Sequence, residues 1–346
     1  MKLIRLKNIF WSEIAASLIC IGATLHSAAG ASADVRLGTL VPRGSSYSDA
    51  LQEMGDKWRS ATGGKSKLII YPDGQQGGEA DMVRKMRSGN LTAGLLTVVG
   101  LAEIDPSVSA LQKMPLVFRS WEEIDYVRTR LEPELNRKLE AKGFVVLFWA
   151  EAGWVRFFAS EPAIHPNDFQ RLKMFVWKGD TTQVEIMKGV GYRPVELETA
   201  DILPGLNTGM INAIPTIPFF ALASQFDAKV PHMLDMKWVP LVGAGVIRKD
   251  AWEKFSPAEQ KVMLQAAKVA GEKIRAAGRK EDQDSITAMQ KRGLTVHTLT
   301  PEIQAEWEKL ARTIYPKIRG GMVPEEMFEK VLSLLEQYRA QNKSAK

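Results

Sequence analysis

Residues 35–72 have the sequence VRLGTLVPRGSSYSDALQEMGDKWRSATGGKSKLIIYP, and this stretch decides the fold. The apolar run at 35–41 predicts a strand, and the turn at 42–46 ends in serines, which commonly cap helices. Apolar side chains then recur at helical spacing, at Leu51, Met54 and Trp58. A second apolar run at 67–71 predicts another strand. Strand, helix and strand in this order are typical of a parallel sheet covered by helices.

The same alternation continues to the end of the chain. Further strands are predicted at 91–99, 144–149, 155–159, 173–177, 193–197, 211–214 and 294–299. Helices are predicted at 79–87, 121–141, 180–189, 198–208, 301–315 and 324–338. A longer helical pattern at 257–292 would extend about 50 Å, enough to cross two lobes. The predicted fold class is therefore α/β.

The composition is that of a globular protein long enough for two domains. Of the 346 residues, 45% are hydrophobic and 25% are charged. The formal net charge is +6, but basic and acidic residues are mixed along the chain. Because the sequence has no basic stripe or arginine-rich arm of the kind that follows phosphates, we expect no nucleic-acid partner.

The N-terminal segment has the three parts of an export signal. Lys2, Arg5 and Lys7 are positive, and residues 14–25 form an uncharged apolar run that is too short to span a bilayer. Ala31-Ser32-Ala33 provides the small residues that a signal peptidase needs. We therefore predict a signal peptide at 1–33, and a mature, soluble protein in the periplasm.

Two alternatives for this segment stay open. It could form a buried N-terminal helix, or Cys20 could carry a lipid anchor, although the bulky Ile19 before it argues against lipid attachment. Cys20 is the only cysteine of the chain. A mature protein starting at Asp34 would therefore contain no disulfide.

Motifs of the common enzyme and metal-site classes are missing from the sequence. It contains no HExxH, GxSxG or GxGxxG pattern. His165, His232 and His297 have no second histidine or cysteine at ligand spacing. Gly64-Lys65-Ser66 precedes a predicted strand, whereas a phosphate-binding loop precedes a helix. We therefore expect no enzymatic activity, no cofactor and no metal.

Several segments, in this order and spacing, resemble the substrate-binding proteins of TRAP transporters. They are RLGTLVP at 36–42, YPDGQQGG at 71–78, MPLVF at 114–118, GWVR at 153–156, LKMFV at 172–176 and LNTGMINA at 206–213. The resemblance covers about residues 34–335. It implies a monomeric receptor with two α/β lobes that binds a small molecule between them and delivers it to the membrane permease subunits.

The resemblance also implies several crossovers between the lobes and a long helix that spans both. We expect lobe 1 to contain residues 34–153 and 236–275, and lobe 2 to contain residues 154–235 and 276–346. In lobe 1, Glu79 and Thr97 would line the cleft. In lobe 2, the cleft residues would be Trp154, Arg156, Phe175, Trp177, Gly209 and Asn212.

The sequence departs from the family pattern at two of these positions. Family members usually carry an arginine where this chain has Phe175, and that arginine binds the ligand carboxylate through two hydrogen bonds. Asn212 replaces the usual aspartate. We therefore expect weak binding of small dicarboxylates and of sugars like sialic acid. The predicted ligand is aromatic or partly hydrophobic, and a monocarboxylate held by Arg156 fits this description.

These residues also have plain structural interpretations. Arg156 could be a surface arginine of a strand. Phe175 and Trp177 share one face of a strand by alternation, so they could form core or cleft wall. Arg43 could move into the cleft and replace the missing guanidinium.

Two other function classes compete with that of a solute receptor. The fold could have lost its acid site and could assist an envelope, signalling or efflux complex through protein contacts. It could also be a hydrolase, but the sequence shows no nucleophile or metal signature. Genes for two membrane subunits beside this one would favour the receptor.

Overall fold

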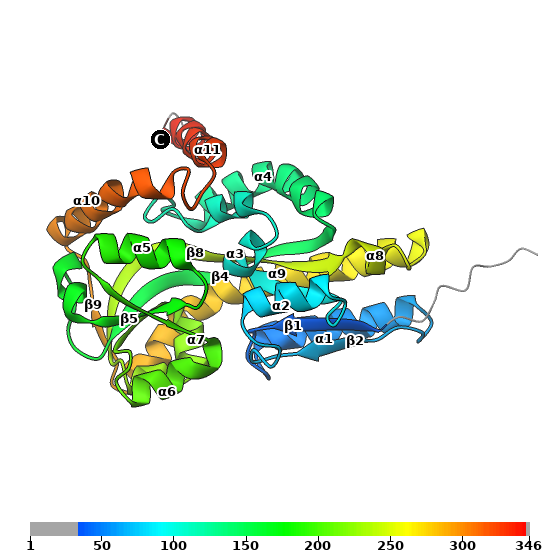
Figure 1. The fold of residues 1–346 in the computed structure, drawn as a ribbon, viewed down its shortest axis with the longest axis horizontal. Helices are drawn as coiled ribbons and strands as arrows, with labels where there is room; N and C mark the ends of the chain where they lie inside the picture. Colours follow the sequence, from blue (N-terminus) through cyan, green and yellow to red (C-terminus); the bar gives the residue numbers. More distant parts are fainter. Residues whose placement is uncertain (1–33, 344–346) are drawn as a thin grey trace, which may run out of the picture. The chain divides into compact units, whose positions relative to one another are not determined.

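The computed structural model describes residues 34–343, so the predicted signal peptide at 1–33 lies outside the described part of the chain. The described residues form a nine-stranded sheet with helices packed on both faces (Figure 1). The strands are β1 (Val35–Thr39), β2 (Leu68–Tyr71), β3 (Ala93–Thr97), β4 (Phe144–Ala159), β5 (Lys173–Trp177), β6 (Arg193–Leu197), β7 (Ala213–Thr216), β8 (His232–Arg248) and β9 (Thr295–His297).

The strand order is β2-β1-β3-β8-β4-β7-β5-β6, and β9 pairs with β8. The outer strands pair in parallel, as β1 does with β2 and β3, and as β5 does with β6 and β7. In the centre, however, β8 is antiparallel to β3 and β4, and β4 is antiparallel to β7. The prediction of a parallel sheet is therefore wrong for the centre, where two long strands connect the two parallel parts.

Strand β4 joins two strands that the sequence analysis predicted separately, at 144–149 and 155–159. The apolar pattern breaks at Glu151 and Gly153, where the pairing with β8 shifts register. A β-bulge keeps the strand continuous across such a break.

Strand β8 was not predicted. Its sequence contains Pro240, Gly243 and Gly245, residues that are unfavourable inside strands. Gly243 is needed where it stands, because a Cβ there would lie 2.6 Å from the carbonyl oxygen of Leu96 on β3.

The helices are α1 (Ser46–Ala61), α2 (Glu79–Arg87), α3 (Val98–Ala102), α4 (Trp121–Ala141), α5 (Thr181–Gly189), α6 (Ile202–Asn207), α7 (Pro218–Ala223), α8 (Lys249–Trp252), α9 (Pro257–Gln290), α10 (Pro301–Ile318) and α11 (Glu325–Lys343). The bounds of α2 and α4 are as predicted, those of α5, α6, α9, α10 and α11 differ from the prediction by up to five residues, and α3, α7 and α8 were not predicted. The serine predicted to cap α1 does so, since Ser45 Oγ accepts from the amide of Ser48 at 3.2 Å. The third predicted strand is two residues too long at its end, because Thr97 caps α3. None of the helices within residues 34–343 is long and apolar enough to cross a membrane.

Helix α9, the predicted long helix, has 34 residues and packs against α1, β4 and α7. Its capping box pairs Ser256 with Glu259. Glycines let it approach β4 closely: a Cβ at Gly271 would lie 2.7 Å from the Phe148 ring, and one at Gly278 would lie 2.6 Å from the carbonyl oxygen of Glu151. The helix therefore contacts α1, α7 and the central strand β4, which lie on both sides of the predicted lobe boundary.

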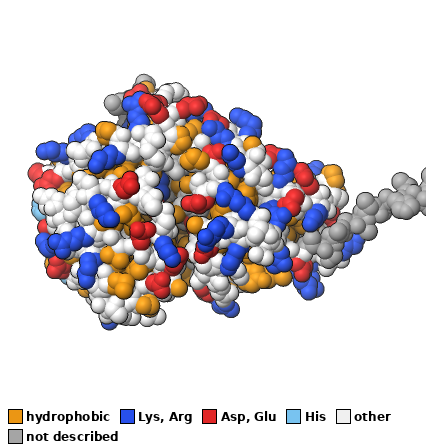
Figure 2. Space-filling view, viewed as in Figure 1, with side chains coloured by type: hydrophobic (Ala, Val, Ile, Leu, Met, Phe, Trp, Pro, Cys, Tyr) orange, Lys and Arg blue, Asp and Glu red, His pale blue; other side chains and the backbone are white. Residues whose placement is uncertain are grey.

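Helix α11 packs against α4, and the guanidinium of Arg339 on α11 lies 2.7 Å from the carboxylate of Glu123 on α4. Residues 325–343 thus lie on an element of the predicted first lobe, although the sequence analysis grouped them with the second. Figure 2 shows basic and acidic side chains interspersed over one face of the molecule.

Candidate functional site

A cavity of about 250 Å³ lies at the carboxyl ends of β1, β3 and β5. This is the usual position for a ligand in an open α/β sheet. The volume is just below the range of about 300–1,000 Å³ that is common for drug-sized ligands. The cavity therefore fits a small molecule, and we call it the apolar cavity.

The wall of the apolar cavity is formed mostly by hydrophobic side chains, many of them aromatic. The aromatic rings come from α1, β4, β5, α7, β8 and the residue before β6, and belong to Tyr47, Phe157, Phe175, Trp177, Tyr192, Phe219, Phe220 and Trp238. Tyr47 and Phe219 meet across the wall, with 4.7 Å between the ring centroids. Such a surface offers flat apolar area to a ligand.

Phe175 and Trp177 lie at the wall, and they also pack together edge to face with 4.8 Å between the ring centroids. The Phe175 side chain is fully buried and belongs to a hydrophobic core with Ile202 and Ile214. The two alternatives that the sequence left open, core or cleft wall, are therefore both true for Phe175.

Glu79 and Thr97 both line the cavity and bind each other. The carboxylate of Glu79 accepts from the Thr97 amide at 2.7 Å, from the Thr97 hydroxyl at 2.6 Å and from the Gly100 amide at 2.8 Å. Burial raises the pKa of Glu79, against the effect of these hydrogen bonds. The acceptor capacity of this carboxylate is thus largely used by the protein itself.

An ion pair between Lys113 and Asp180 also lines the apolar cavity. Lys113 follows the 3₁₀ helix η1 (Pro106–Leu111), and Asp180 is the N-cap of α5, where it accepts from the amide of Gln183. The two side chains are only 12% and 14% exposed. The sequence analysis missed both residues, because a lone lysine in a loop carries no signal of its own.

Arg156 does not line the cavity, although its neighbours Val155 and Phe157 do. Its guanidinium is buried between two carboxylates, at 2.7 Å from Asp235 on β8 and at 2.9 Å from Asp282 on α9. It also donates to the carbonyl oxygen of Trp154. The structure therefore places Arg156 in a structural ion-pair cluster, and neither a surface arginine nor a free ligand contact describes it.

Three other predicted residues also lie away from the cavity. Trp154 is buried against Trp121, with 5.0 Å between the ring centroids. Gly209 and Asn212 bind Lys173, which begins β5: Asn212 Oδ1 accepts from the Lys173 amide at 2.6 Å, and the Gly209 carbonyl accepts from its ammonium group. The cavity lies at Trp177, at the other end of that strand.

Arg43, which could have replaced the missing guanidinium, is exposed and lies 3.6 Å from Asp73. It is not among the cavity residues. Within residues 34–343, no three His, Cys, Asp or Glu side chains lie close enough together to hold a metal ion.

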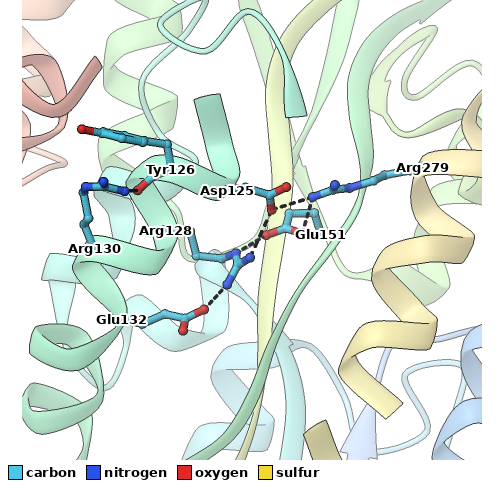
Figure 3. Close-up of polar contacts among 7 residues, drawn as sticks. All are labelled: Asp125, Tyr126, Arg128, Arg130, Glu132, Glu151 and Arg279. Atoms are coloured by element: carbon cyan, nitrogen blue, oxygen red, sulfur yellow. Dashed lines mark hydrogen bonds and ion pairs between the residues drawn. The ribbon is translucent and has the colours of Figure 1, made fainter. Parts of the chain in front are cut away.

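A second cluster of buried charges surrounds Glu151 (Figure 3). Arg128 on α4 and Arg279 on α9 both point at the fully buried Glu151 on β4, at 2.6 Å and 3.6 Å, and share Asp125. Burial raises the pKa of Glu151, and the two arginines oppose this effect. The two clusters fasten α9 to β4 near the register shift, and their arginines are bound to carboxylates of the protein.

Residues 37–320 match the family described as bacterial extracellular solute-binding protein, family 7. The C4-dicarboxylate-binding periplasmic protein DctP of Rhodobacter capsulatus is 22% identical over 270 residues, which cover 77% of this chain and 80% of the relative. An uncharacterized protein of Haemophilus influenzae is 25% identical over 285 residues, which cover 81% of this chain and 86% of the relative.

Two crystal structures of TRAP periplasmic solute-binding proteins share the fold. The protein from Ralstonia eutropha H16, with bound (S)-2-acetolactate, has a TM-score of 0.81 at 18% identity, and the match covers 88% of this chain and 99% of that chain. The protein from Sulfurospirillum deleyianum, with bound succinate, has a TM-score of 0.80 at 21% identity, with coverages of 87% and 98%. These matches confirm the predicted α/β fold of a periplasmic binding protein.

Proposed function

Since the chain belongs to the bacterial extracellular solute-binding proteins of family 7, we propose that it captures a small, largely apolar organic acid and delivers it to a TRAP-type permease. The family comprises receptors, which confirms the prediction that the chain is not an enzyme. The observation that carries the ligand proposal is the aromatic wall of the apolar cavity.

The proposal includes two lobes that close over this cavity, with boundaries near Gly153 and Met236. Strands β4 and β8 cross this boundary, and the register shift at Glu151 and Gly153 lies on it. Contacts such as Tyr47 with Phe219 and Lys113 with Asp180 connect the two parts across the cavity. Helix α11 is assigned to the first lobe in this proposal, because it packs against α4.

The ligand class follows from what the wall offers. Phe175 occupies the wall where the family resemblance leads us to expect an arginine, so a second carboxylate would lose its water and find no two-pronged donor there. The R. capsulatus relative is described as binding C4-dicarboxylates, and the S. deleyianum protein holds succinate. The R. eutropha protein holds acetolactate, which has a single carboxylate and two methyl groups and is nearer to the ligand proposed for this chain.

The test is a thermal-shift and calorimetric screen of the protein purified after periplasmic expression. Phenylacetate and 4-methyl-2-oxopentanoate are compared with succinate, malate and sialate. A ligand at about 100 times its Kd stabilises the folded state by about 2.7 kcal/mol, which is a clear shift in Tm. We expect such a shift from the apolar acids only. Micromolar binding of succinate or malate contradicts the ligand class, and the absence of any stabilising compound favours the protein-interaction alternative.

Trp177→Ala provides the matched variant for this screen. Trp177 is half-buried at the wall, so its truncation should weaken the apolar acids without unfolding the chain. Tyr338→Ala is the control, since Tyr338 packs on Tyr126, and neither residue lines the cavity. Equal effects of the two variants on affinity would show that the ligand does not contact the aromatic wall.

A further inference from the structure

Few charged side chains line the apolar cavity. Among the described residues that line it, the charged side chains are Glu79, Lys113 and Asp180. Lys113 is thus the single cation of this lining. The nearby arginines Arg128, Arg156 and Arg279 are held by carboxylates of their own and do not line the cavity.

The two carboxylates of the lining differ in how they are held. Glu79 is fixed by three hydrogen bonds from Thr97 and Gly100 and has little capacity left for a new partner. Asp180 has a second role beside its ion pair, because it caps α5 by accepting from the Gln183 amide. If Lys113 turned to another anion, Asp180 would keep a hydrogen bond and the favourable field of the helix N-terminus.

Lys113 and Asp180 also stand at the boundary with a second cavity, which we call the polar cavity. Its lining shares six residues with the apolar cavity: Glu79, Val99, Lys113, Trp177, Asp180 and Met322. Five carboxylates and two lysines line it: Glu79, Asp81, Glu103, Asp180, Glu198, Lys113 and Lys178. The ion pair therefore separates an apolar space from an acidic one.

On these observations, and on the proposed function, we infer that the Lys113 ammonium binds the acid group of the ligand, taking it in exchange for Asp180. The apolar part of the ligand then lies along the wall of Phe175 and Trp177. A second acid group would meet no further cation in the described lining and would face Glu79 and Asp180, like charges in a poorly solvated space. Lys113 and its surroundings thus select ligands with one acid group.

The experiment compares two probes of the same shape, phenylacetate and its neutral amide phenylacetamide, by calorimetry on the full-length mature protein. Lys113→Met keeps the length of the side chain and removes its charge. We expect it to weaken phenylacetate roughly ten- to hundredfold, the size of a lost charged hydrogen bond, and to leave phenylacetamide nearly unchanged. 4-Methyl-2-oxopentanoate serves as a second acid probe and should respond like phenylacetate.

Asp180→Asn removes the competing carboxylate while asparagine still caps α5. We expect this variant to bind phenylacetate more tightly, on the order of fivefold. Lys178→Met is the control, because Lys178 is exposed, lines only the polar cavity and lies 3.7 Å from Glu198. Lys178→Met should bind phenylacetate and phenylacetamide with affinities within about twofold of those of the wild type.

These measurements distinguish a wrong assignment of Lys113 from a wrong assignment of the receptor function. Acid binding that survives Lys113→Met, or a loss shared equally by phenylacetate and phenylacetamide, overturns the role of Lys113 and leaves the receptor function standing. Weaker phenylacetate binding in Asp180→Asn overturns the exchange. If neither acid binds to wild type or to Asp180→Asn, the proposed function fails together with the inference.

Discussion

Replacing Arg156 by methionine should destabilise the protein and leave the contacts of a bound ligand intact. The methionine fills much of the volume of the arginine stem, but it removes the charge between Asp235 and Asp282. Asp235 is 39% exposed and can turn to water, whereas Asp282 is 11% exposed and loses its nearest cation. Breaking a buried ion pair from one side costs about 3–5 kcal/mol.

The cost should depend on pH, because Asp282 can become neutral. Burial already raises the pKa of Asp282 above its usual value, with Arg156 opposing this effect. Without Arg156 the folded-state pKa rises further above that of the unfolded chain, so protonation favours folding of the variant. The stability gap to wild type should be largest at neutral pH and shrink as the pH falls toward the unfolded-state pKa of about 4.

Urea unfolding of the wild type and of Arg156→Met between pH 5 and 8 measures the difference in their free energies of unfolding. Arg171→Met is the control. Arg171 is exposed and lies 2.6 Å from Glu161, so its loss should leave the unfolding midpoint unchanged. Adding Asp282→Asn to Arg156→Met should recover part of the stability, because the amide carries no charge to bury. A variant as stable as wild type that no longer binds the acid probes would refute this reasoning and restore Arg156 as the ligand contact predicted from the sequence.

Three further predictions concern α9, the cavity and the N-terminus. Gly278→Ala should lower the free energy of unfolding in urea by about 1–3 kcal/mol, because the added Cβ would lie 2.6 Å from the Glu151 carbonyl oxygen on β4. An unchanged urea midpoint would mean that α9 can shift away from β4 without cost. Phe175→Arg should give succinate binding by calorimetry that wild type lacks, since it puts a guanidinium on the cavity wall; equal succinate affinities would contradict the role assigned to Phe175. Intact mass of the periplasmic protein should correspond to a chain starting at Asp34, and a mass that includes residues 1–33 or a lipid on Cys20 excludes this cleavage.

The helices and outer strands could be predicted because their signals are local. Helix α4 and strand β5 have the predicted bounds, since the apolar residues of α4 keep helical spacing past Pro133 and β5 is one short apolar run. The prediction failed for the central strands β4 and β8, because their formation depends on residues far away in the sequence. The break at Glu151 and Gly153 in β4, and Pro240 with two glycines in β8, suggest loops until the partner strand is known, because a long-range ladder overrides local preference there.

Some residues of the candidate site could likewise be predicted from local sequence, and others could not. Alternation along one strand was enough to suggest that Phe175 and Trp177 form a wall, and both do line the cavity. The environment of Arg156 was beyond local reasoning, because its carboxylate partners lie 79 and 126 residues further along the chain. Lys113 belongs to no motif. Only its ion pair with Asp180 and its position in the cavity lining identify it as a candidate ligand contact.

The positions of the basic side chains connect the stability of the molecule with its selectivity. Arg128, Arg156 and Arg279 hold α4, β4, β8 and α9 together through buried carboxylates, so their charges are neutralised within the framework. A guanidinium bound in this way cannot serve a ligand without leaving a buried carboxylate uncompensated, at a cost of several kcal/mol. Lys113 differs because its partner Asp180 has another donor. The residue that can release its counter-ion most cheaply is therefore the one that faces the ligand, and a single exchangeable cation beside an aromatic wall favours one acid group on an apolar body.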